Sequence, residues 1–273
     1  MTTVGQGSKD IASVNRDYPW DDFSPKKYFK KNYKTLRDDD HQIVGIVRDF
    51  FAANFGVMPV PSGLRGIDVG TGANLYPALT MLPFCEKVTL CDYSAANVKW
   101  LEDQHKKRWP TWRRWPSWRQ AWKRFWKLLC TEPAYAALRR PKEALAERVE
   151  IVQGDVLAKP AQNAWDMGTM FFVAESITRD EGEFLKAVDN FFAMLKSDAP
   201  FAMAFMEHSK GYHVGTTRFP ATDIDFDDVY SCLHERAHDI KIHPIVGKKP
   251  LRDGYSRMIV AHGRVKRVVE EAP

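Results

Sequence analysis

Three short polar motifs each follow an apolar run of the sequence, and their residue types suit the binding of a nucleoside. Asp68-Val69-Gly70-Thr71-Gly72 ends the first run, Asp92 ends the second, and Gly154-Asp155-Val156 follows the third. Glycines let a backbone approach a ligand closely, one carboxylate can accept from both hydroxyls of a ribose, and a second acid can accept from an adenine amine. The motifs therefore predict a nucleoside ligand without a pyrophosphate, which describes S-adenosylmethionine better than NAD.

The glycine motif alone is weak evidence, because it departs from the dinucleotide-binding fingerprint GxGxxG. Leu75 occupies the position of the third glycine. A simpler interpretation is that Asp68, Asp92 and Asp155 only cap the helices that follow them. We favour the ligand interpretation because the motifs end successive predicted strands, where ligands bind in open α/β sheets.

Apolar runs and amphipathic segments predict the elements that position these motifs. The predicted strands cover 64–72, 86–94, 148–156, 165–173, 199–207, 239–246 and 256–264, and the predicted helices cover 24–55, 94–107, 181–196 and 227–238. Strands and helices alternate up to the fifth strand, which implies right-handed crossovers and a parallel arrangement. We expect an α/β, Rossmann-like fold with a seven-stranded, mostly parallel sheet, an antiparallel closing pair and helices on both faces.

The composition is that of a globular protein and not of a disordered, collagen-like or coiled-coil chain. The 273 residues are 44% hydrophobic and 27% charged. The four cysteines have no CxxC spacing, and none of the eight histidines has ligand spacing with cysteines or acids, so we expect no disulfide scaffold and no metal site. We find neither a run of about 18 apolar residues nor a signal-peptide pattern, which predicts a cytoplasmic protein without a membrane span.

One segment, Lys106 to Lys127, departs from this composition. It holds nine Lys or Arg residues, no acid and six of the nine tryptophans, although the whole chain has a net charge of only +5. Ser117 can cap a helix with one apolar face, formed by Trp118, Trp122, Phe125, Trp126 and Leu129. We favour a packed amphipathic helix over a nucleic-acid or membrane-surface contact, although Trp and Arg together suit both stacking and phosphates.

Several motifs taken together resemble a known family. FSPKKYFKKNYKTL, GIDVGTGANLYPAL, VTLCDYSAANVKWLE, GDV and MEHSKGYHVGTTRFP occur in this order. They are similar to motifs of the small-molecule methyltransferases that include nicotinamide, phenylethanolamine and thioether methyltransferases. The resemblance extends from about Phe23 to Phe219 and implies a class I methyltransferase fold with an N-terminal helical lid and S-adenosylmethionine as the cofactor.

The resemblance also implies which residues bind the cofactor. Tyr28 and Tyr33 of the N-terminal helix would clasp its methionine end, and Asp92 would hold its ribose. The full predicted set is Tyr28, Tyr33, Gly70, Thr71, Gly72, Tyr76, Asp92, Tyr93, Asn97, Asp155, Val156 and Phe171.

On the acceptor side, the resemblance places the substrate-contacting acid of the family on Glu207. This chain departs from the family pattern where His213 and Asn32 replace tyrosines and where Phe171 or Phe172 replaces a polar contact. We therefore expect an acceptor that differs from the vertebrate substrates of the family. The predicted substrate-binding residues are Asn32, Glu175, Glu207, Tyr212 and His213.

Methyl transfer from a sulfonium is an in-line displacement, in which catalysis is largely positioning and desolvation. Glu207 could hold an acceptor amine by a charge-assisted hydrogen bond, and His213 is a candidate base because an imidazole titrates near neutrality. The simpler interpretations are a solvated loop carboxylate and a surface histidine.

The sequence thus predicts an S-adenosylmethionine-dependent N-methyltransferase with a small-molecule amine as acceptor and without a nucleic-acid partner. RNA methylation through the basic segment, or another reaction of the bound sulfonium such as cyclisation, is the alternative. We expect a disordered lead-in over 1–16 and one methyltransferase domain over 17–273, in which 17–58 form the lid and 106–140 form a Trp/Arg-rich insertion. The sequence does not indicate an oligomeric state.

Overall fold

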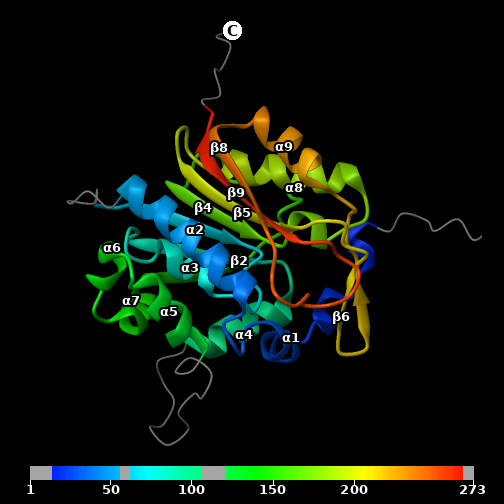
Figure 1. Ribbon diagram of the computed structural model, residues 1–273, viewed down its shortest axis with the longest axis horizontal. Helices are drawn as coiled ribbons and strands as arrows, with labels where there is room; N and C mark the ends of the chain where they lie inside the picture. Colours follow the sequence, from blue (N-terminus) through cyan, green and yellow to red (C-terminus); the bar gives the residue numbers. More distant parts are fainter. Residues whose placement is uncertain (1–13, 56–61, 106–120, 267–273) are drawn as a thin grey trace, which may run out of the picture.

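The computed structural model describes residues 14–55, 62–105 and 121–266, which contain a central seven-stranded sheet (Figure 1). The strands, in their order across the sheet, are β3 Val149–Gln153, β2 Lys87–Asp92, β1 Arg65–Val69, β4 Met167–Phe171, β5 Pro200–Met206, β9 Met258–Val265 and β8 Ala237–Ile245. The first five are parallel, and β9 is antiparallel to both β5 and β8. The predicted α/β fold with an antiparallel closing pair is confirmed.

The order of the strands reverses its direction between β1 and β4. β1 pairs with β2 on one side and with β4 on the other. In open α/β sheets, ligands bind beyond the carboxyl ends of the strands at such a point. Since β1, β2 and β3 end at Val69, Asp92 and Gln153, the three motifs lie together at this edge.

Helices cover both faces of the sheet (Figure 1). On one side lie α1 Pro25–Asn32, α2 Asp38–Phe55, α3 Tyr76–Met81, α4 Ala95–His105 and α5 Lys123–Leu129, and on the other lie α8 Glu181–Met194 and α9 Phe226–His234. Shorter elements are η1 Asn15–Asp17, η2 Trp20–Asp22, α6 Pro133–Ala136, α7 Pro141–Arg148 and η4 Ala174–Ser176. The central strands β4 and β5 are buried along their whole length, as expected for parallel strands covered on both faces.

The single helix predicted over 24–55 is wrong, because the structure has two helices there. α1 ends at Asn32, and Tyr33 leaves the helical conformation with a ψ of 2°. α2 then begins with three consecutive aspartates, which the partial positive charge of a helix N-terminus stabilises. Arg37, just before this start, pairs with Asp39 at 2.9 Å.

Two further features differ from the sequence prediction. Residues 212–219, where the sequence predicts neither a strand nor a helix, form a hairpin of β6 Tyr212–Val214 and β7 Thr217–Phe219. The predicted end of the lead-in at residue 16 falls inside η1, where Asn15 is buried. The rest of that lead-in, residues 1–13, lies outside the described residues.

The described end of the basic segment favours the packed-helix interpretation. Trp122, Phe125 and Leu129 are buried in the core, whereas Lys123 and Arg124 are exposed. Residues 106–120 lie outside the described residues. They include the predicted helix cap, Ser117, and the tryptophans Trp109, Trp112, Trp115 and Trp118. Within the three described ranges, no helix has the length and apolarity needed to cross a membrane.

Asp180→Ala should destabilise the fold without changing the ligand edge of the sheet. The Asp180 carboxylate caps α8 by accepting a hydrogen bond from the backbone N–H of Glu183 at 2.8 Å. Loss of such a cap costs about 1 kcal/mol, which lowers the melting temperature of a domain of this size by about 2–4 °C. Thermal unfolding measures the shift, with the exposed neighbour variant Glu181→Ala as control. Equal melting temperatures for the two variants would contradict the capping role.

Candidate active site

A cavity lies at the carboxyl ends of β1 to β4, at the edge where the glycine and acidic motifs meet. Among the predicted cofactor-binding residues, those that line it are Tyr28, Tyr33, Gly70, Thr71, Gly72, Asp92, Tyr93, Asn97, Asp155, Val156 and Phe171. Tyr76 does not line it. The structure therefore brings residues that are far apart in the sequence around one space.

The loop after β1 requires glycine at two positions. Gly70 and Gly72 have φ values of 68° and 51°, in the region that favours glycine. A Cβ at Gly70 would also lie 2.3 Å from Cγ2 of Val173. The backbone N–H groups of Gly70 and Thr71 donate to the carbonyl of Cys91 at 2.8 and 3.1 Å, which fixes the loop against the end of β2.

Asp92 accepts three hydrogen bonds from two elements. Its Oδ2 accepts from the N–H of Gly72 at 2.7 Å, and its Oδ1 accepts from the N–H of Ser94 at 2.9 Å and from Nδ2 of Asn97 at 3.0 Å. The side chain is buried, and this burial raises the pKa of the carboxyl above its ordinary value although the three donors lower it. A carboxylate has about four acceptor positions, so capacity is left for a hydroxyl of a ligand.

Two asparagines on the cavity wall carry polar atoms without partners. Nδ2 of Asn74 and Oδ1 of Asn97 are buried and have no hydrogen-bond partner within the described part of the chain. Buried polar groups are normally satisfied. A donor and an acceptor left over on the wall of the cavity fit a polar ligand such as the predicted cofactor.

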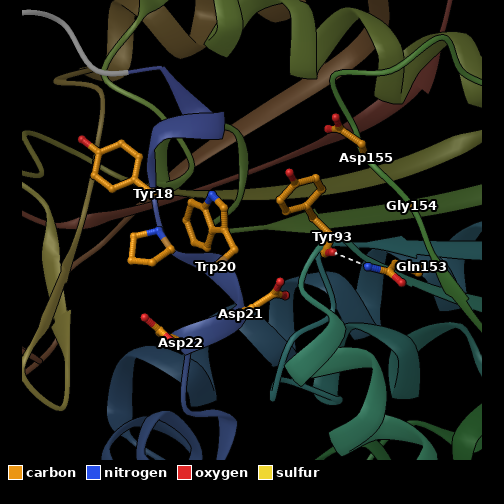
Figure 2. Close-up of a pocket in the computed structure, with 9 residues that line it drawn as sticks. Tyr18, Trp20, Asp21, Asp22, Tyr93, Gln153, Gly154 and Asp155 are labelled. Atoms are coloured by element: carbon orange, nitrogen blue, oxygen red, sulfur yellow. Dashed lines mark hydrogen bonds between the residues drawn. The ribbon is translucent and has the colours of Figure 1, made fainter.

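Figure 2 shows a second hollow, which adjoins the cavity at Tyr93 and Asp155. It is lined by Tyr18, Pro19, Trp20, Asp21, Asp22, Tyr93, Gln153, Gly154 and Asp155. Nε2 of Gln153 donates to the carbonyl of Tyr93 at 3.1 Å and joins the ends of β2 and β3. The predicted adenine end of the site therefore opens into this hollow, whereas aromatic side chains enclose the other end.

The N-terminal segment closes over the cavity through specific hydrogen bonds. Oγ of Ser94 donates to the carbonyl of Trp20 at 2.8 Å, and the N–H of Ala95 donates to Oδ1 of Asp21 at 3.2 Å. Farther back, the N–H of Asn15 donates to Oε2 of Glu183 on α8 at 2.7 Å. The segment is thus fastened to helices on both faces of the sheet.

Aromatic rings form the end of the cavity opposite to Asp155. The ring of Tyr28 lies 5.9 Å from that of Tyr33 and 6.2 Å from that of Tyr212. Phe171 and Phe172 complete this wall. Phe172 has a φ of 58°, a left-handed conformation that costs a bulky residue about 1–3 kcal/mol and that occurs most often at functional sites.

Behind this wall lies a buried acid that the sequence reasoning missed. Burial raises the pKa of Asp40 to about 8, and Asp40 acts electrostatically on Tyr28, Tyr33 and Tyr76. The hydroxyl of Tyr76 is itself buried, and the side chains of Asp40 and Asn74 act on it. Three consecutive aspartates before an apolar helix indicate a helix start, so the pattern gives no sign that one of them lies behind the aromatic wall.

Glu175, predicted to bind the substrate, lies in η4 and does not itself line the cavity, but it acts electrostatically on the cavity-lining Tyr28 and Tyr212. It is fully buried, and its Oε1 accepts from Oγ of Ser176 at 2.9 Å and from the N–H of Met206 at 3.2 Å. Its Oε2 is buried and unpartnered. Burial raises the pKa of Glu175 to about 7, and the carboxyl acts electrostatically on Tyr28 and Tyr212. An acid that titrates near neutrality beside a cavity can exchange a proton with a ligand.

Glu207 is not the solvated loop carboxylate of the simpler interpretation. Its side chain is buried, and its Oε1 accepts from Nη2 of Arg257 at 2.7 Å. Their backbones also pair, since the N–H of Glu207 donates to the carbonyl of Arg257 at 3.0 Å. Glu207 does not line the cavity, and its charge is balanced by an arginine that the sequence reasoning did not single out.

The remaining predicted substrate residues differ in position. Tyr212 lines the cavity, whereas Asn32 is buried at the end of α1 and His213 is exposed on β6, and neither of these two lines it. Among the described residues, no three His, Cys, Asp or Glu side chains gather in a way that could hold a metal ion.

Comparison with known proteins supports this geometry. The model of the NNMT/PNMT/TEMT family matches residues 12–255. The N-methyltransferase NodS from Bradyrhizobium japonicum WM9, solved with S-adenosyl-L-homocysteine, is similar with a TM-score of 0.52 at 12% identity, over 85% of this chain and 89% of that one. A SAM-dependent methyltransferase from Methanosarcina mazei gives a TM-score of 0.50 at 10% identity, over 80% of this chain and 98% of that one.

The CurJ carbon methyltransferase also has a TM-score of 0.50, at 9% identity, over 85% of this chain and 57% of that one. At such low identities these likenesses show the fold alone. They confirm the Rossmann-like, class I methyltransferase fold. No curated protein matches the sequence.

Asp92→Ala should weaken the binding of S-adenosylmethionine at least about tenfold, because a lost charged acceptor typically costs about 1.5–3 kcal/mol. Calorimetry with the cofactor measures the affinity, and a melting curve shows whether the variant is folded. Asp92→Asn keeps the side-chain shape and should be weakened as well. Asp103→Ala, on the exposed side of α4, is the control. Unchanged affinity in a folded Asp92→Ala variant would remove Asp92 from the cofactor site.

Proposed function

Because the chain belongs to the NNMT/PNMT/TEMT family, we propose that it transfers a methyl group to a nitrogen atom of a small-molecule amine. As a member of this family, the protein is an S-adenosylmethionine-dependent methyltransferase. The finer proposal, an amine as acceptor and nitrogen as the methylated atom, is supported by the residues at the aromatic end of the cavity.

The described residues fit the cofactor. Asp92 would hold the ribose, Asp155 would face the adenine, and the unpartnered atoms of Asn74 and Asn97 belong to residues of the same cavity wall. When bound, S-adenosylmethionine supplies a methyl group on a positively charged sulfur, which becomes a neutral thioether. The segment that contains Trp20 would keep water out of the closed site.

The observation that carries the amine proposal is the carboxyl of Glu175. It is fully buried, its Oε2 lacks a partner, and it lies in electrostatic reach of the cavity-lining Tyr28 and Tyr212. An unpaired buried carboxylate is costly, and a cationic partner would offset that cost. An amine is the acceptor that would bring such a partner.

Glu175 also has the acidity that proton transfer from an amine needs. Because its pKa is raised to about 7, it is substantially ionised at neutral pH and is still a stronger base than an ordinary carboxylate. Glu175 would first take a proton from the bound ammonium group, which frees the lone pair of the nitrogen. That lone pair would form the new N–C bond as the C–S bond breaks, with the electron pair of the C–S bond left on sulfur. Tyr28, Phe171 and Tyr212 would hold an aromatic or apolar frame against the methyl position.

We assign a positioning role to Glu207 and no proton transfer to His213. The ion pair of Glu207 with Arg257 ties the end of β5 to the loop before β9, and Ser256 N–H donates to the Glu207 carbonyl at 2.9 Å in the same place. His213 is exposed on the hairpin, outside the residues that line the cavity. RNA as the acceptor has little support, because the described part of the basic segment packs Trp122 and Phe125 into the core.

Incubation with cofactor labelled in the methyl group, together with a panel of aromatic amines, aromatic thiols and tRNA, tests the proposal. We expect label in one or more amines and in neither of the other classes. Transfer only to thiols or only to tRNA would refute it. Cofactor that is consumed without transfer to any acceptor would point instead to another reaction of the sulfonium.

Glu175→Gln should lower kcat/KM for the accepted amine at least about tenfold and leave the cofactor affinity within about threefold, because a missing base costs turnover and not cofactor contacts. In the wild type, kcat/KM should fall as the pH drops below about 7, where Glu175 becomes protonated. The variant should lose this dependence.

Glu207→Gln is the matched comparison. Since Glu207 pairs with Arg257 and does not line the cavity, we expect a smaller loss of kcat/KM in this variant and a pH profile like that of the wild type. The assignment of the base to Glu175 is wrong if Glu207→Gln, and not Glu175→Gln, abolishes the acidic limb of the profile.

A further inference from the structure

The loop between β8 and β9, residues 246–257, places Arg252 against Tyr212, a residue of the aromatic wall, although Arg252 does not itself line the cavity. The guanidinium carbon of Arg252 lies 4.9 Å from the centre of the Tyr212 ring, and Tyr212 lines the cavity. Nη2 of Arg252 donates to Oγ of Ser209 at 2.9 Å and contacts Sδ of Met206 at 3.1 Å. These contacts fix the guanidinium at the end of β5, beside the wall that would hold the acceptor.

Arg252 is a cation without an anionic partner. Within residues 14–55, 62–105 and 121–266, no carboxylate lies within ion-pairing distance of it, and its Nε is buried without a hydrogen-bond acceptor. Arg257, five residues later in the same loop, has its charge balanced by Glu207 at 2.7 Å. The Nε atoms of both arginines lack a hydrogen-bond acceptor, but only the charge of Arg257 is balanced by an ion pair among the described residues.

The position of Arg252 relative to Glu175 limits what the ligand can be. Both groups act electrostatically on Tyr28 and on Tyr212, and Arg252 also lowers the pKa of Glu175, so the two charges lie within electrostatic reach of each other. They are not hydrogen-bonded to each other: Oε1 of Glu175 is occupied by Ser176 and Met206, and its Oε2 has no partner. The aromatic wall is thus flanked by an acid and a cation, each with bonding capacity to spare.

We propose that the acceptor is a zwitterion, an amine that also carries a carboxylate, with the amine at Glu175 and the carboxylate at Arg252. This inference rests on the proposed function and adds a second charged group to the acceptor. The planar guanidinium fork matches a carboxylate in geometry and charge. A single arginine balances one negative charge, which favours a carboxylate over a doubly charged phosphate.

Matched pairs of aromatic amines that differ only in the carboxylate test the inference: phenylalanine with phenethylamine, tyrosine with tyramine, and tryptophan with tryptamine. Methyl transfer is measured with labelled cofactor. We expect kcat/KM to be at least about tenfold higher for the carboxylate member of the preferred pair, because a charge-assisted contact adds that much.

Arg252→Met removes the charge and keeps an apolar stem. It should lower kcat/KM for the carboxylate member at least about tenfold, mainly through KM, and leave the member without a carboxylate within about threefold. Arg252→Lys keeps the charge without the planar guanidinium fork. Its kcat/KM for the carboxylate member should lie between that of the wild type and that of Arg252→Met. Arg218→Met, which removes an exposed arginine from the neighbouring strand β7, is the control for a general effect of charge. Cofactor affinity, measured by calorimetry, shows that each variant is folded.

The outcomes separate the two proposals. Methylation of the amines without a carboxylate at equal or higher kcat/KM, or an equal loss for both members in Arg252→Met, overturns the zwitterion and leaves the amine proposal standing. Methylation of thiols or tRNA with no transfer to either member of any pair overturns both.

Discussion

The buried carboxylate of Asp92 is the interaction on which the ligand edge of the sheet depends. Burial penalises its charge, so the fold must supply donors. They come from Gly72 after β1 and from Ser94 and Asn97 at the start of α4. The N–H of Gly72 points at Asp92 because the loop passes through positive φ at Gly70 and Gly72, which glycine adopts without strain. One side chain therefore joins the ends of two strands and the first turn of a helix around the space where a ribose would lie.

The N-terminal segment depends on the same corner of the fold. Ser94, whose N–H donates to Asp92, uses its hydroxyl to hold the carbonyl of Trp20. Trp20 and Phe23 then pack on Phe219 of the hairpin, at ring distances of 4.9 and 5.2 Å. The N-terminal segment and the hairpin thus share one small, largely aromatic cluster, in which Trp20, Phe23 and Tyr212 line the cavity. A ligand that orders Asp92 would also order the start of α4 and, through Ser94, the lid.

The seven strands and the ligand edge could be predicted because each depends on local patterns: an apolar run, a glycine turn and an acid at the strand end. The break between α1 and α2 could not be, since the apolar spacing continues on both sides of Tyr33. The hairpin could not be predicted either, because its two strands have only three residues each. Asp40, Arg252 and Arg257 have no local signal at all, because their roles arise from contacts with distant strands and loops that only the folded chain brings together.

The charges at the aromatic end differ in how completely they are paired, and this difference fits a site for a charged ligand. The pair of Glu207 and Arg257 satisfies itself and fixes the loop. Glu175 and Arg252 are held by neutral partners instead. Ser176 and Met206 donate to Glu175, and Ser209 and Tyr212 contact Arg252. A proton on Glu175 removes the cost of burying its charge, which is why its pKa lies near 7 despite the nearby cation. An incoming ammonium group would take the place of that proton, so binding the acceptor and ionising the base are one event.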